Sequence, residues 1–192
     1  MKNKFRTSSK IALVLIYFVI VAGAIVRMTG SGMGCPDWPK CFGYYIPPTE
    51  SKQLDFKPKH AYKKGMMILI DQEAFLVAKT DFISSDSLNT ANWETYSKHD
   101  YTTYDPVHTW VEFINRLVGV VSGIPILIFT VLSFWFWKKN KWIPIVSILT
   151  LFGMGFQAWL GKTVVDSNLA PYKITIHMVM ALLIVAFILY LI

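Results

Sequence analysis

The chain has 192 residues, of which 54% are hydrophobic and 16% charged, and its formal net charge is +7. This composition is too apolar for an ordinary soluble domain and indicates a membrane protein. The distribution of the basic residues argues against nucleic-acid binding, because the clusters without acidic residues flank apolar runs and eight further lysines are mixed with acidic residues between Asp37 and Asp105.

The charge pattern also predicts an orientation. Residues 2–10 and 138–141 are basic without any acid, whereas ten of the twelve acidic residues lie between Asp37 and Asp105. By the positive-inside rule, we expect a multi-pass protein of the cell (inner) membrane. Its N-terminus and residues 138–141 would be cytoplasmic, and residues 33–105 would lie outside.

The first predicted membrane span covers about residues 11–28, with Arg27 at its outer end. A cleaved signal peptide is the alternative, because basic residues precede the run and Ala22-Gly23-Ala24 is a small-residue cleavage pattern. Composition alone leaves both open.

The segment TGSGMGCPDWPKC, residues 29–41, is rich in glycine and proline and predicts a loop. Cys35 and Cys41 are the only two cysteines of the chain. On the predicted topology both lie outside the membrane, where oxidation is permitted, so we expect a disulfide. Two idle thiols are the alternative.

The rest of the 33–105 segment predicts a modest extracytoplasmic subdomain. The apolar runs between Met66 and Lys79 are too short to span a membrane and fit strands or a small helix. His60 and His99 are interpreted as solvated surface histidines.

The second span is predicted at 107–137 and opens with VHTWVEFINRLVG. His108, Glu112 and Asn115 have the i, i+4, i+7 spacing of one helix face, and Arg116 is adjacent. Ionisable residues at the mouth of a membrane span are candidate functional residues, because carrying their charge into lipid is costly.

The third span is predicted at 142–160, with Gln157 near its outer end, and the fourth at 174–192, with His177 about one turn below the 161–173 loop. The predicted fold is therefore an all-α membrane protein: a four-transmembrane-helix bundle with an extracytoplasmic insertion between helices 1 and 2. Spans 2 and 4 both run inward, so Glu112, Asn115 and His177 are expected at similar depth, where bundles build cofactor sites.

A histidine on such a face could ligate heme iron or form an interhelical hydrogen bond, and the residues leave both open. The nearby aromatic residues suit either porphyrin walls or a membrane-interface belt; they are Trp110, Phe113, Phe156 and Trp159. The outer cations suit either propionate pairing or interfacial anchoring; they are Arg27, Arg116, Lys162 and Lys173.

Three motifs, in order TGSGMGCPDWPKC, EFINR and GKTVVDSNLAPYKITIHMVMA, resemble the N-terminal half of the heme A synthase family of cytochrome oxidase assembly proteins. The resemblance implies a membrane oxidoreductase that converts a methyl group of heme O to the formyl group of heme A. It also implies two similar four-helix halves, with heme B in the second, so this chain would be one half. It argues against signal cleavage.

By motif position, Glu112 matches the family's catalytic glutamate and His177 its fourth-helix histidine. We expect His177 to ligate the substrate heme, Glu112 to take up protons, and Arg116 to orient Glu112 or a propionate. Cys35 and Cys41 match a pair that is commonly disulfide-linked. Arg27, Asn115 and Gln157 complete the expected cofactor-binding set.

One residue departs from the family pattern, which is EYIHR: Asn115 stands where a histidine should be, and an amide is a poor ligand for heme iron. His108 is the second candidate ligand, but it lies about 10.5 Å up the helix axis. Either the heme sits higher, or the loop folds His108 inward, or His177 is the only protein ligand.

The expected partners are heme O, membrane lipid, a heme O synthase, and a second half-domain or a second copy of the chain, with no nucleic acid. The alternative function is a non-catalytic heme-binding or assembly module that delivers heme to a terminal oxidase. A transporter-like or structural bundle without a tetrapyrrole is a third interpretation.

Overall fold

The computed structural model describes residues 1–70, 74–97 and 103–192, so His99 lies outside the described residues. The chain forms two compact units. We call Met1–Met28 with Ile114–Ile192 the helical unit, and Thr29–Phe113 the strand unit.

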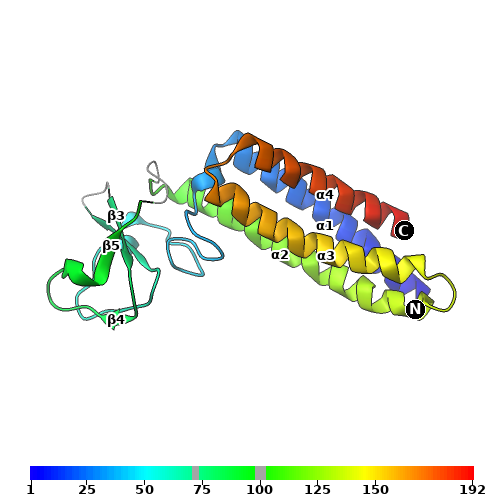
Figure 1. Cartoon of the computed structure of the whole chain (residues 1–192), viewed down its shortest axis with the longest axis horizontal. Coiled ribbons are helices and arrows are strands. Elements are labelled where there is room, and N and C mark those ends of the chain that lie inside the picture. Colours follow the sequence, from blue (N-terminus) through cyan, green and yellow to red (C-terminus); the bar gives the residue numbers. More distant parts are fainter. Residues whose placement is uncertain (71–73, 98–102) are drawn as a thin grey trace. The chain divides into compact units, whose positions relative to one another are not determined.

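Four long helices dominate the structure (Figure 1). They are α1 (Lys2–Met28), α2 (Pro106–Ser133), α3 (Trp142–Asp166) and α4 (Pro171–Leu191), and a short 3₁₀ turn, η4 (Phe134–Phe136), follows α2. Each is long and apolar enough to cross a membrane. The predicted four-helix membrane bundle is therefore confirmed, and the protein is a multi-pass membrane protein.

One predicted loop is partly helical. Residues 161–166, expected in the connection between spans 3 and 4, continue α3 to Asp166. Lys162 and Asp166 form an i, i+4 ion pair of 3.1 Å on this last turn, an arrangement that supports a helix end. The predicted span ends with the apolar run at residue 160, whereas charged residues are tolerated where a helix extends beyond the lipid.

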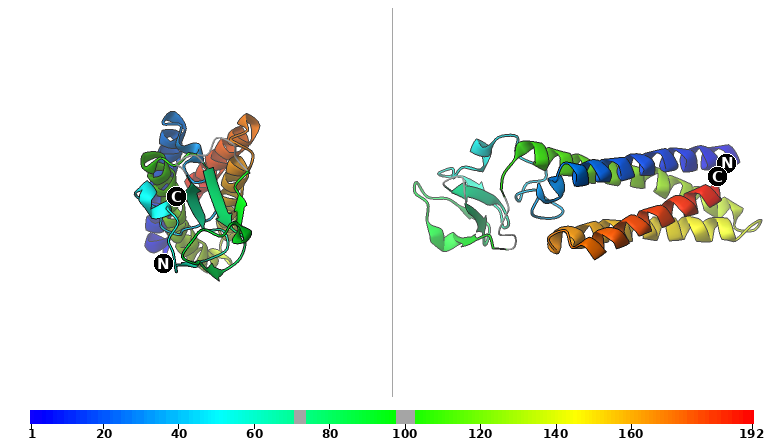
Figure 2. Two further views of the ribbon diagram at one scale, coloured as in Figure 1. Left: turned by 90° about the vertical axis from the view of Figure 1, so that its left-hand side faces the viewer. Right: turned by 90° about the horizontal axis from the view of Figure 1, so that it is seen from above.

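The helical unit is held together around α4, which packs against both α3 and α1 (Figure 2). Its core includes Phe5, Phe129 and Ile188, none more than 3% exposed. Hydroxyl groups add contacts between helices: Ser8 donates to the Pro125 carbonyl over 2.9 Å, and Thr130 donates to the Ser147 carbonyl over 3.1 Å. Serine and threonine commonly join membrane helices in this way.

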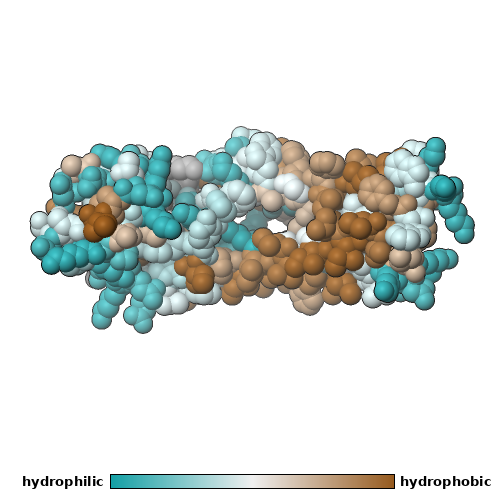
Figure 3. All heavy atoms as spheres, turned by 90° about the horizontal axis from the view of Figure 1, so that it is seen from below, coloured by the Kyte–Doolittle hydropathy of each residue, from teal (hydrophilic) through white to brown (hydrophobic). Residues whose placement is uncertain are grey.

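The outside of the helical unit is apolar. Val120, Phe152 and Leu182 are each more than 60% exposed, and Figure 3 shows hydrophobic residues covering much of one face of these helices. An apolar exterior of this extent suits lipid contact and would be a liability in water.

The strand unit contains two small antiparallel sheets. In the first, β1 (Ala61–Tyr62) pairs with β4 (Phe82–Ile83); in the second, β3 (Ala74–Ala78) lies between β2 (Met67–Ile70) and β5 (Trp93–Thr95). Three 3₁₀ turns complete the unit: η1 (Ser31–Met33), η2 (Ser51–Leu54) and η3 (Thr90–Asn92). Residues 67–70 and 74–78 of this stretch are thus strand rather than helix.

Alternating side chains on β2 serve two separate cores. Met67 packs with Phe42 and Phe75, whereas its neighbour Ile68 packs with Tyr62 and Trp93. Successive strand residues point to opposite faces, so one strand can join both clusters. His60 is half-buried, with its ring 4.8 Å from that of Tyr62, and is not the fully solvated histidine that the sequence suggested.

Helix α2 starts at a well-formed cap. The Asp105 carboxylate accepts from the backbone N–H groups of Val107 (2.7 Å) and His108 (3.1 Å), and Pro106 occupies the first helical position. The bond from the His108 N–H is the main reason that the pKa of Asp105 lies below its ordinary value of 3.8; the Val107 N–H adds to the effect. The cap fixes where the helix that carries Glu112 begins.

Candidate functional site

His177 lies in the second turn of α4 and is half-buried in the helical unit. Its ring meets α3 at Gly161, where an added Cβ would stand 3.5 Å from the imidazole Cε1. The Nδ1 atom is buried and has no hydrogen-bond partner among the described residues. The imidazole therefore keeps bonding capacity that the protein itself does not use.

Gln157 in α3 is the neighbour of His177 across the helix pair. Its Nε2 donates to the His177 backbone carbonyl over 3.0 Å. Its Oε1 is buried, and within the described part of the chain it has no hydrogen-bond partner. Gln157 thus joins α3 to α4 beside the imidazole and leaves one buried acceptor.

Asn115 in α2 carries a third buried polar atom of this kind. Its Oδ1 is buried without a hydrogen-bond partner in residues 1–70, 74–97 and 103–192. It lies 3.8 Å from the place where a Cβ on Gly23 of α1 would stand. A buried polar atom without a hydrogen bond costs about 1–3 kcal/mol, and native proteins contain few of them. Three such atoms in the helical unit leave buried polar groups that the described residues do not satisfy.

Two glycines on α2 leave room beside the helix backbone. Gly119 and Gly123 are four residues apart and so lie on one face of the helix. No described atom lies within 4 Å of the Cβ position of either. With their small size, they let a flat ligand approach the backbone closely.

The expected outer cations differ in their contacts. Lys162 pairs with Asp166, and Lys173 donates to the Thr163 carbonyl over 3.3 Å. Arg27 is exposed, with its guanidinium 3.6 Å from the Met178 sulfur, a weak acceptor. Arg116 is half-buried on α2. Arg27 is therefore the cation best able to bind an anionic group.

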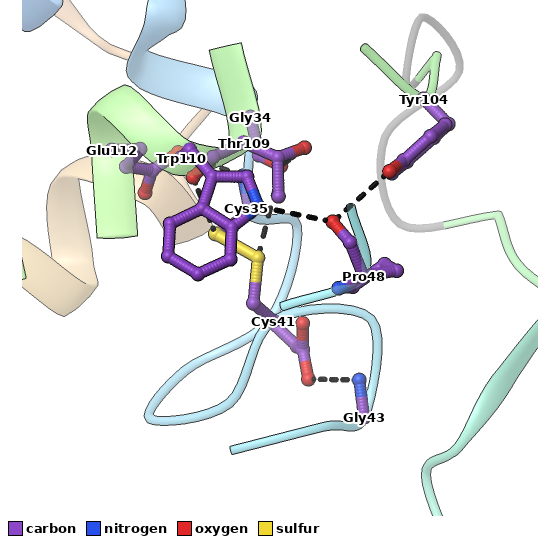
Figure 4. The surroundings of a disulfide bond; sticks show 10 residues. Gly34, Cys35, Cys41, Gly43, Pro48, Tyr104, Thr109, Trp110 and Glu112 are labelled. Carbon is purple, nitrogen blue, oxygen red and sulfur yellow. Dashed lines mark hydrogen bonds between the residues drawn. A yellow bond between two sulfur atoms is a disulfide. The ribbon is translucent and has the colours of Figure 1, made fainter. Parts of the chain in front are cut away.

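In the strand unit, Glu112 is the central acidic residue. Its side chain is only 3% exposed, and its Oε2 accepts the backbone N–H of Cys35 over 2.7 Å (Figure 4). A hydrogen bond to an ionised carboxylate is among the stronger ones and offsets part of the cost of burial.

The loop that supplies this N–H is closed by a disulfide. Cys35 and Cys41 are bonded, with an S–S distance of 2.02 Å, which confirms the expected pair. Both cysteines are buried, and the Cys35 Sγ lies 3.6 Å from the Thr109 carbonyl oxygen (Figure 4). The cysteine loop therefore packs directly on the first turns of α2.

The predicted site residues are divided between the two units. Asn115, Arg116, Gln157, His177 and Arg27 belong to the helical unit, whereas Glu112 and a half-buried His108 belong to the strand unit. In the part of the chain that the structure describes, no group of three or more His, Cys, Asp or Glu side chains could hold a metal ion. A heme needs at most two such ligands, and these residues remain predictions for its iron.

Two residues that matter here were not singled out from the sequence. Thr109 is fully buried and donates to the Gly34 carbonyl over 2.9 Å, and Gly34 itself lies against the α2 backbone. An Asp-Pro pair before a helix and a glycine next to a cysteine are the only local signals for this contact.

The chain is similar to a family of known proteins. A family model described as cytochrome oxidase assembly protein matches residues 7–78 and 87–192. Among curated relatives, the chain is 25% identical to a heme A synthase of Shewanella oneidensis over 88% of its length. It is 28% identical to one of Flavobacterium psychrophilum over 90%. No solved structure gives a significant match.

The chain spans less than half the length of these relatives: 39% of the Shewanella protein and 45% of the Flavobacterium protein. A shorter match to a heme A synthase of Geobacillus thermodenitrificans reaches 35% identity over 36% of this chain.

Proposed function

Because the chain belongs to the cytochrome oxidase assembly protein family, we propose that it acts in heme A biosynthesis, as a membrane oxidoreductase that converts a methyl group of heme O to the formyl group of heme A. Relatives named heme A synthase support this assignment. Since the chain spans less than half of them, it would supply part of the activity together with a second half-domain, which carries heme B, or with a second copy of itself.

The observation that carries the proposal is the polar chemistry inside the helical unit. His177, Gln157 and Asn115 come from three different helices, and each has a buried atom without a partner among the described residues. The open faces of Gly119 and Gly123 lie in the same unit. An apolar bundle with an imidazole and two amides suits a large, flat, mostly apolar ligand that has a metal at its centre.

His177 is the proposed ligand to the iron of the substrate heme. Its imidazole is half-buried, and its Nδ1 has no hydrogen-bond partner among the residues that the structure describes. Gln157 holds the backbone of the same residue and would set the depth of the ring. Asn115 would contribute an amide to the substrate instead of a second imidazole, and His108 is the second candidate for ligation.

Glu112 is the proposed proton acceptor. Oxidation of a methyl group releases protons as well as electrons, and a carboxylate close to the reacting carbon can take them up. Its burial and the hydrogen bond from the Cys35 N–H support a defined position for this carboxylate. Arg116 would orient Glu112 or a propionate, and Arg27 would pair with a propionate.

The same proposal includes the surroundings of the chain. By the positive-inside rule, the basic N-terminus and the basic 138–141 turn would lie in the cytoplasm, and the protein would lie in the cell (inner) membrane. A heme O synthase would supply the substrate, and an oxidant from outside the chain would accept the electrons.

The test is pigment extraction. The chain is expressed in cells that make heme O and lack their own heme A synthase, and membrane hemes are identified by chromatography and mass. We expect heme A with the wild type, and bound heme without heme A with Glu112→Gln. Glu94→Gln, an exposed residue of β5, is the matched control.

Three outcomes would contradict the proposal. Undiminished heme A with Glu112→Gln removes the assigned proton acceptor. Bound heme O that the wild type never converts, also when the C-terminal half of a heme A synthase is co-expressed, favours a delivery module. A colourless protein in heme-supplied cells favours a structural bundle.

A further inference from the structure

A single peptide plane in the strand unit is held by two side chains of α2. Its carbonyl, that of Gly34, accepts from the Thr109 hydroxyl over 2.9 Å, and its N–H, that of Cys35, donates to Glu112 over 2.7 Å (Figure 4). We propose that Thr109 is a positioning residue for Glu112, because it holds this peptide so that the N–H stays directed at the carboxylate.

The rigidity of the peptide group makes the coupling direct. A peptide bond is planar, so the Gly34 carbonyl and the Cys35 N–H turn together. Any rotation that breaks the bond to Thr109 also moves the donor away from Glu112. Hydrogen bonds weaken steeply once the donor angle departs from linearity, so even a modest rotation weakens the contact.

The two side chains are suited to hold both ends of the plane. Thr109 and Glu112 are three residues apart on α2 and therefore lie on the same face. Thr109 is fully buried, and Glu112 is only 3% exposed. Solvent cannot easily replace either bond, so the loss of the Thr109 hydroxyl would leave the Gly34 carbonyl buried without this donor, which costs free energy.

Gly34 allows the approach that these bonds need. A Cβ at this position would overlap the backbone carbonyl of His108 and lie 2.8 Å from the Thr109 nitrogen. The loop is therefore in contact with the helix backbone, and only a glycine fits there. This contact fixes the distance between the loop and the helix. The orientation of the Gly34–Cys35 peptide is fixed by its two hydrogen bonds.

The far end of the loop is held by hydrogen bonds that do not involve Thr109 or Glu112. Cys41 exchanges two backbone hydrogen bonds with Tyr44, of 2.8 and 3.0 Å, and Asp37 accepts the Gly43 N–H over 2.8 Å. The disulfide joins this closed turn back to Cys35. A Thr109 variant should accordingly keep the loop and the disulfide while releasing the Gly34–Cys35 peptide.

The expected effect of Thr109 on the rate of heme A formation rests on the proposed function of Glu112. The expected effect of Thr109 on the position of the Glu112 carboxylate does not. Hydrogen bonds to a carboxylate change the balance between its two protonation states. Loss of the Thr109 bond should alter the pH dependence of heme A formation and lower kcat, with KM for heme O little changed, because Thr109 does not lie among the residues proposed to bind heme.

The experiment compares Thr109→Val, which keeps the shape and loses the hydroxyl, with Thr109→Ser, which keeps the hydroxyl. Infrared difference spectra of the purified full chain, with Glu112→Gln to assign the carboxyl band, report on Glu112 directly. We expect Thr109→Val to shift this band and to lower kcat roughly 10- to 100-fold. Thr109→Ser should restore both, and Thr95→Val, at an exposed position of β5, should change neither.

The outcomes separate the two proposals. An unshifted Glu112 band and an unchanged pH profile in Thr109→Val overturn the positioning role. If Glu112→Gln keeps full activity, the proposed function fails, while the infrared comparison still decides whether Thr109 positions the carboxylate. Thiol labelling confirms that the disulfide has formed, and Thr109→Ala replaces the valine variant if that chain does not fold.

Discussion

Gln157 in α3 donates from its side-chain amide to the backbone carbonyl of His177 in α4, over 3.0 Å. A helix carbonyl ordinarily accepts only from the N–H four residues further along, so this second bond joins the two helices at one defined level. It lies next to Gly161, where the His177 ring meets α3. The pair therefore sets the register of α3 against α4 beside the proposed iron ligand.

Replacing Gln157 with leucine should remove this join at nearly constant volume. We expect a loss of about 1 kcal/mol in the free energy of unfolding in detergent, typical of hydrogen bonds between membrane helices, and a lower heme content per chain. Phe152→Leu, at a 73% exposed position on the same helix, is the control. A heme content equal to wild type would show that this bond does not position His177.

Replacing His177 with alanine should remove the ligand to iron. The expected result is loss or a strong shift of the Soret absorption of the purified protein, because one axial ligand is lost. His108→Ala should have the smaller effect, and His60→Ala, directly before β1 in the strand unit, should have none. If only His108→Ala abolishes the heme spectrum, the ligand assignment is wrong.

Gly34→Ala tests the close approach of the cysteine loop to α2. The added methyl group would overlap the His108 carbonyl, so the loop must move outward and lose the bonds to Thr109 and Glu112. We expect a loss of about 1–3 kcal/mol in stability, the usual range for overpacking. Thermal unfolding in detergent measures it. Gly155→Ala, with open space around its Cβ position, should be neutral.

The cap on α2 predicts that the stability of this helix end depends on pH. Folding lowers the pKa of Asp105, chiefly through the bond from the His108 N–H, so the charged carboxylate favours the folded state. Its contribution is fully present above the unfolded pKa, near 3.8, and is lost as the pH falls through the lower folded value. Asp105→Asn keeps an acceptor for the cap and removes this dependence.

Hydrogen exchange of the Val107 and His108 amides between pH 5 and pH 3 is the appropriate measurement, since these groups donate to the cap. In the wild type their protection should fall at the acid end of this range. In Asp105→Asn, protection should be lower than in the wild type at pH 5 and nearly constant between pH 5 and pH 3. Equal profiles in the two proteins would rule out the carboxylate as the source.

The sequence by itself determined the membrane class, the four helices and the cysteine pair. These features depend on local properties: an apolar run of about 20 residues must be helical to satisfy its backbone in lipid, and the two cysteines had no other partner to choose. The predicted third span ends at residue 160, whereas α3 continues to Asp166, because the Lys162–Asp166 pair supports a helix beyond the apolar run.

Only the tertiary structure decided what the candidate site residues touch. Glu112 bonds to the backbone N–H of Cys35, Thr109 to the carbonyl of Gly34, and Gln157 to the carbonyl of His177. Each partner is a main-chain group, which every residue type carries, so no pattern of side chains in the sequence could indicate it. The chain must fold before one particular N–H or carbonyl is brought within about 3 Å of these side chains.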